Sequence, residues 1–180
     1  PDAWLALAQE HRVHISAVVP SMLQMLVREP LEDYDLSSLR YVVSGAAPLP
    51  PEVAEAFMRR VPSVQIREGY GLSESSAIVS GNPPGRIRPG SVGVPLDGVE
   101  VRIDAPDDAG VGEILVRSPS VMQGYWRATD ATAETVRDGW LHTGDLGRLD
   151  EDGYLYVVDR TKDLIIRGGF NVFPRDVEEA

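Results

Sequence analysis

The sequence predicts an α/β protein: a parallel sheet flanked by helices, then a small antiparallel β-barrel-like sheet, and then the start of an α+β domain. Over the first 70 residues, apolar β-branched runs alternate with amphipathic helical patterns. From Gly81 onward, Gly and Pro residues separate shorter strand patterns. After Asp159 there follow a strand, a Gly-Gly turn, a short strand and the beginning of a helix.

The alternating first part predicts parallel strands, because strand–helix–strand units with short connections place successive strands side by side. Pro20 stops the first strand, and Pro51 occupies the first position of the third helix. Ligands bind beyond the carboxyl ends of such strands, where the turns 44–48 and 69–74 fall. The expected strands are 15–19, 39–43 and 64–67, and the expected helices are 2–11, one containing 22–26, and one that begins at residue 51.

The second part predicts short antiparallel strands around one helix of about residues 129–136. The Asp150–Gly153 segment is typical of a hairpin turn. We therefore expect an α/β subdomain over 1–85, a β-barrel-like subdomain over 86–158, and a hinge with the start of a small C-terminal domain over 159–180. The expected strands of the barrel-like part are 99–103, 113–117, 146–149 and 154–158.

Composition excludes several classes of protein. The net charge of -11 argues against a surface for nucleic acid, which needs clustered Lys and Arg. The absence of cysteine excludes disulfides, thiolate catalysis and Cys-ligated zinc. No apolar run approaches the roughly 20 residues of a transmembrane helix, so we expect a cytoplasmic protein. Both ends fall within helical patterns and the first residue is not Met, which indicates an internal fragment.

Gly69–Ser76 carries side chains suited to a nucleotide. The glycines permit a sharp turn, and Tyr70 offers a flat face to a base. Ser73 can donate to a phosphate, and Glu74 is a hard oxygen ligand suited to Mg²⁺. The alternative is a tight turn capped by Ser73, with Glu74 as an acid in the first helical turn.

Two other segments are candidates for ligand contact. Ser44–Pro48 has small side chains and could admit a planar base, although a plain strand-to-helix connection is the better explanation of this segment alone. Asp145 and Arg160 could converge on a vicinal diol such as that of ribose, or they could form a salt bridge with each other. His142 shows no pattern of a catalytic histidine.

These motifs, in this order, resemble those of the adenylate-forming superfamily: acyl-CoA synthetases, luciferases and the adenylation domains of peptide synthetases. Tyr70–Glu74 is similar to its Tyr-Gly-x-Thr-Glu signature, with Ser73 in place of the usual Thr. Gly139–Asp145 resembles its Thr-Gly-Asp motif, and Asp159–Pro174 resembles its hinge motif. Within the superfamily the hinge motif is most similar to that of a fatty-acid–CoA ligase.

The resemblance implies a two-step reaction: ATP and a carboxylic acid give an acyl-adenylate and pyrophosphate, and CoA then displaces AMP to form a thioester. It also implies a role for each matching residue. The adenine would be framed by Gly45, Ala46, Ala47, Gly69, Tyr70 and Gly71. Ser73 would hold the α-phosphate, Glu74 would hold Mg²⁺, and Asp145 with Arg160 would hold the ribose. Lys162 would be the hinge, and the CoA route would be lined by Arg167, Gly168 and Gly169.

Three alternatives remain open: an aryl-acid ligase, a short-chain-acid ligase, and a non-catalytic folding or interaction fragment. The Gly- and Ser/Thr-rich phosphate loop of the superfamily is missing from these residues, as is its C-terminal catalytic lysine. We therefore expect the 180-residue chain by itself to have negligible ligase activity.

Overall fold

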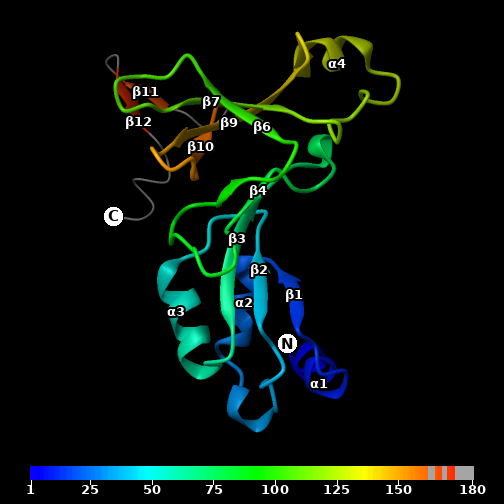
Figure 1. Ribbon diagram of the computed structural model, residues 1–180, viewed down its shortest axis with the longest axis vertical. Helices are drawn as coiled ribbons and strands as arrows, with labels where there is room; N and C mark the ends of the chain where they lie inside the picture. Colours follow the sequence, from blue (N-terminus) through cyan, green and yellow to red (C-terminus); the bar gives the residue numbers. More distant parts are fainter. Residues whose placement is uncertain (162–164, 168–169, 173–180) are drawn as a thin grey trace.

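The computed structural model describes residues 1–161, 165–167 and 170–172. Its first sheet has the strand order β1-β2-β3-β4-β5; the first three strands are parallel and the last two are antiparallel (Figure 1). The strands are β1 Ile15–Val18, β2 Tyr41–Ser44, β3 Gln65–Tyr70, β4 Ser80–Gly81 and β5 Val94–Pro95. The connecting helices are α1 Asp2–Glu10, α2 Pro20–Leu26 and α3 Pro51–Arg60, with short 3-10 turns at Leu31–Asp33 and Ser73–Ser75.

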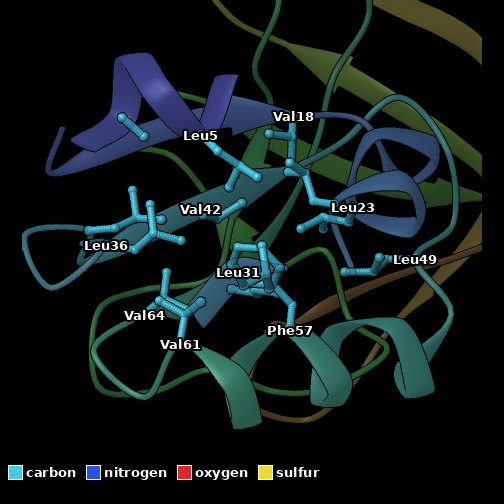
Figure 2. Close-up of a cluster of buried hydrophobic side chains, with 14 residues drawn as sticks. Leu5, Val18, Leu23, Leu31, Leu36, Val42, Leu49, Phe57, Val61 and Val64 are labelled. Atoms are coloured by element: carbon cyan, nitrogen blue, oxygen red, sulfur yellow. The ribbon is translucent and has the colours of Figure 1, made fainter. Parts of the chain in front are cut away.

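Helices α1, α2 and α3 bury one apolar face each against the first sheet. Leu5, Leu23 and Phe57 are fully buried and surround Val42 of β2, the middle one of the three parallel strands (Figure 2). Pro20 and Pro51 begin their helices where a missing backbone N–H costs nothing. The core therefore lies between this sheet and its helices, and the carboxyl ends of the strands are left free for a site.

The second sheet is a curled antiparallel sheet with the order β10-β9-β7-β6, and β8 pairs with β9 beside it. Its core consists of Val79, Ile114, Val116, Leu141 and Leu155, all buried. The strands are β6 Glu100–Asp104, β7 Gly112–Arg117, β8 Val136–Arg137, β9 Trp140–Leu149 and β10 Leu155–Arg160; helix α4 is Thr129–Thr135, and β11 Ile165–Arg167 pairs with β12 Phe170–Val172.

The predicted fold class is confirmed, but one strand was placed incorrectly. β9 begins at Trp140 and not at Leu146, so the Thr143–Asp145 segment lies inside a strand. The two domain boundaries stay predictions; β5, beyond the expected boundary at residue 85, still hydrogen-bonds to β4 of the first sheet. Within the described residues, no helix is long and apolar enough to cross a membrane.

Candidate active site

A cavity of about 590 Å³ lies between the carboxyl ends of the first sheet and the edge of the second. The two segments that the sequence singled out in the first sheet meet here with Asp145 and Arg160 of the second sheet. Its lining comprises Ser44, Ala46, Ala47, Pro48, Glu68, Gly69, Tyr70, Gly71, Gly90, Val92, Asp145, Val157, Val158, Asp159 and Arg160.

Asp145 is the buried anion of this cavity, with a side chain only 5% exposed. Its Oδ2 accepts a hydrogen bond of 2.6 Å from the Tyr70 hydroxyl, and its Oδ1 accepts one of 3.0 Å from Arg160 Nε. The Arg160 side chain is 68% exposed, so most of it remains in water. Asp145 and Arg160 therefore form the salt bridge that was the alternative interpretation, and their convergence on a ribose stays a prediction.

Tyr70 connects the two sheets at this point. Burial raises the pKa of its hydroxyl well above the ordinary tyrosine range, and the negative charge of Asp145 raises that pKa further. The hydroxyl therefore stays protonated and donates to Asp145 at any physiological pH. The expected contact of the Tyr70 ring with a base stays a prediction.

The two loops beyond β2 and β3 hold strained backbone. Ala46, Ser76 and Ala77 have φ values of 71°, 56° and 83°, in the left-handed region that costs an L-residue about 1 kcal/mol or more. Gly71 packs so closely on the backbone of Ala77 that a Cβ atom would overlap its carbonyl oxygen. Such strain concentrates at ligand sites, because the surrounding fold must hold it in place.

Ser73 and Glu74 are not among the residues that line the cavity. Ser73 is exposed in the 3-10 turn, and Glu74 Oε1 accepts a hydrogen bond of 2.8 Å from the Tyr125 hydroxyl. Among the described residues, no group of three or more His, Cys, Asp or Glu could hold a metal ion. Mg²⁺ can bind to one carboxylate together with the phosphates of a nucleotide, which supply further oxygen ligands. Glu74 by itself fits Mg²⁺ only in this way.

A second cavity, of about 440 Å³, adjoins the first and shares Ser44, Ala46 and Gly69–Gly71 with it. The Ser44 side chain is buried, and its hydroxyl has no hydrogen-bond partner within the part of the chain that the structure describes. The rest of the lining is apolar or glycine: Ala17, Val18, Val19, Met22, Val43, Gly45, Ala77 and Ile78. A ligand that fills both cavities would thus be polar at one end and apolar at the other.

The protein-family model of AMP-binding enzymes matches residues 1–126. The chain belongs to this family. This places the chain in the adenylate-forming superfamily, as the three motifs predicted.

Relatives of this chain differ in the reactions that their names state. The long-chain-fatty-acid–CoA ligase of Bacillus subtilis (strain 168) is 41% identical over 100% of this chain and 33% of its own length. The structure of the amide bond synthetase McbA from Marinactinospora thermotolerans has a TM-score of 0.86 at 41% identity, covering 98% of this chain and 37% of that one.

The anthranilate CoA ligase AuaEII, solved in complex with anthranoyl-AMP, has a TM-score of 0.87 at 32% identity, over 98% of this chain and 35% of that one. The chain thus spans about a third of the length of each of these three proteins.

Several residues that the sequence predicted for the site cannot be compared with the structure. Lys162, Gly168 and Gly169 lie outside the described residues, and Arg167 is described only as backbone of β11. The cavity lining also includes residues that the sequence did not single out: Glu68, Gly90, Val92, Val157, Val158 and Asp159. Asp159 Oδ2 is buried without a hydrogen-bond partner among the described residues, and a carboxylate beside Arg160 at a strand end was the available signal.

Proposed function

We propose that this chain carries the nucleotide and acyl sites of an ATP-dependent acid–CoA ligase. The observation behind the proposal is the buried Asp145, held by Tyr70 and Arg160 in a cavity between two sheets. A carboxylic acid is a poor acyl donor until its oxygen becomes part of a leaving group, and transfer of AMP from ATP supplies that group. Catalysis then depends on positioning and on charge stabilisation.

The loops beyond the first sheet would receive the nucleotide. Gly45–Ala47 and Gly69–Gly71 would frame the adenine with backbone and small side chains. Asp145 accepts hydrogen bonds and Arg160 donates them, so the two suit the two hydroxyls of a ribose. Ser73 would donate to the α-phosphate, and Glu74 would hold Mg²⁺, which neutralises phosphate charge when bound.

The segment beyond β10 would serve the second half-reaction. Lys162 would be the hinge about which a C-terminal domain turns, a lid-type movement. Arg167, Gly168 and Gly169 would then line the route of CoA. The McbA amide bond synthetase shows that a relative at 41% identity is named for a product other than a thioester, so the acceptor needs a direct assay.

The apolar second cavity supports an apolar acid. No Asp, Glu, Lys, Arg or His belongs to its lining among the described residues, so a charged acyl group would lose its hydration without a partner. A fatty acid is our first candidate, as in the Bacillus subtilis relative, and an aryl acid is the second, as in the anthranilate ligase. The two candidates are separated by assaying a panel of acids with a protein that contains this chain and has the length of its relatives. The release of pyrophosphate measures the activation of each acid.

The nucleotide site is tested by titrating the purified chain with AMP in a calorimeter. Asp145→Asn keeps the shape but loses the charge that strengthens two hydrogen bonds, so we expect the Kd for AMP to rise about 10- to 100-fold. Asp138→Asn makes the same chemical change at an exposed turn and should leave the Kd unchanged. No binding of AMP by the unaltered chain would remove the nucleotide assignment.

We also propose that the 180-residue chain by itself forms no acyl-CoA. A phosphate loop and the catalytic lysine of the superfamily have no counterpart in its sequence, so the β- and γ-phosphates lack a cationic partner there. Thioester formation by the pure chain with ATP, Mg²⁺, CoA and palmitate would contradict this.

A further inference from the structure

We propose that Glu113, on β7, is a positioning residue that holds Asp145 in the geometry that binds the ribose. This inference rests on the proposed nucleotide site. Glu113 is not among the residues that line the cavity, so it would act through the backbone of β9 and not by touching the nucleotide.

Asp145 lies in an irregular stretch of β9. Leu115 pairs with His142 whereas Glu113 pairs with Leu146, so two steps along β7 correspond to four along β9. The extra residues lie between these pairs, where Gly144 has a left-handed φ of 71°. A bulge of this kind interrupts the ladder, leaves backbone amides unpaired and re-aims the side chains within it.

The Glu113 carboxylate supplies the hydrogen bond that the ladder lacks. Its Oε1 accepts from the Gly144 N–H at 3.0 Å. Thr143 makes a second tie, because its hydroxyl donates to Ile114 O at 2.7 Å and accepts from the Asp145 N–H at 3.1 Å. Side chains on both strands thus fix consecutive residues of the bulge, and Asp145 is the last of these residues.

The other oxygen of Glu113 is also engaged. Oε2 lies 3.0 Å from His142 Nδ1, which in turn lies 2.8 Å from a guanidinium nitrogen of Arg137. One ring nitrogen either donates to Glu113 or accepts from Arg137, so His142 can serve only one of them at a time. A glutamine at position 113 would keep the acceptor for Gly144 and could donate to His142, whereas an alanine would keep neither.

The test compares AMP with 2′,3′-dideoxy-AMP, which lacks the ribose hydroxyls. We expect the unaltered chain to bind AMP about tenfold more tightly, because two hydrogen bonds to Asp145 and Arg160 are lost with the dideoxy ligand. Glu113→Ala should reduce this preference to less than about threefold, and Glu113→Gln should restore it. Glu100→Ala, which removes an exposed carboxylate from the neighbouring strand, should leave it unchanged.

The ratio of the two Kd values separates positioning from general damage. A variant that merely unfolds more easily weakens both ligands by the same factor and keeps the ratio. An unchanged ratio in Glu113→Ala would therefore overturn the role of Glu113. Equal binding of both ligands by the unaltered chain would instead remove the ribose role of Asp145, and no AMP binding at all would remove the nucleotide site.

Discussion

Asp145 shows what a buried carboxylate needs in order to be tolerated. An isolated charge in the interior costs several kcal/mol, and here Tyr70 and Arg160 each donate one hydrogen bond to a separate oxygen. Asp145 and Tyr70 lie 75 residues apart in the sequence, so no local pattern could predict that they touch. Sequence motifs identified both residues as candidates for the site, and only the fold shows that Tyr70 donates a hydrogen bond to Asp145.

The hydroxyl of Tyr70 predicts a dependence of stability on alkaline pH. In the unfolded chain this hydroxyl ionises near pH 10, whereas its pKa in the folded state is higher. The contribution of Tyr70 to stability is therefore fully present below about pH 10 and is lost as the pH rises from there towards the folded pKa.

Tyr70→Phe tests this dependence. At neutral pH the variant should be about 1–3 kcal/mol less stable, because Asp145 Oδ2 loses its donor. The difference in the free energy of unfolding between the variant and the unaltered chain should narrow above about pH 10. Tyr70 titrates there and phenylalanine does not, so only the unaltered chain loses this contribution. Urea unfolding at several pH values measures both quantities, and the other tyrosines cancel because both proteins carry them. A gap that stays constant into strongly alkaline solution would contradict the raised pKa.

At the scale of elements, the loop that follows β3 depends on one close backbone approach. Gly71 lines both cavities, and a Cβ atom there would overlap the carbonyl group of Ala77. Gly71→Ala should therefore lower the free energy of unfolding by about 1–3 kcal/mol and weaken AMP binding at the same time. Gly81→Ala on β4 is the matched control, since its Cβ would meet no atom within 4 Å and should change stability by less than about 0.5 kcal/mol. Equal effects of the two changes, in thermal melts and AMP titrations, would show that the close approach is unimportant.

Elements with strong local signals were predicted well. The apolar runs around β1 to β3 and the prolines at the first positions of α2 and α3 follow rules that act within a few residues. β9 was misjudged because Thr143–Asp145 has the composition of a turn, yet pairing with β7 and β10 keeps this segment in a strand with a bulge. The two-residue strands β4 and β5 form through tertiary pairing and leave no periodic pattern to detect.

At the scale of the whole molecule, the site lies between two sheets that each have their own hydrophobic core. One core lies between the first sheet and its helices, and the other lies within the curled sheet. Tyr70 of β3 packs against the second core although its strand belongs to the first sheet. The cavity of about 590 Å³ takes its lining from both parts, so a ligand inside it touches both.

This arrangement predicts that AMP stabilises both sheets together. A ligand that binds only the folded state adds about 2.7 kcal/mol at a hundred times its Kd, and the gain is shared by every segment that must be folded for binding. Hydrogen exchange with AMP should therefore slow at the amides of both β3 and β9, including Gly69 and Gly147. In Asp145→Asn, with AMP at the same concentration, the slowing should shrink on both strands in parallel, because the single cavity joins them. Slowing confined to β3 would mean that the nucleotide contacts only the first sheet, and the second sheet would then have no part in its recognition.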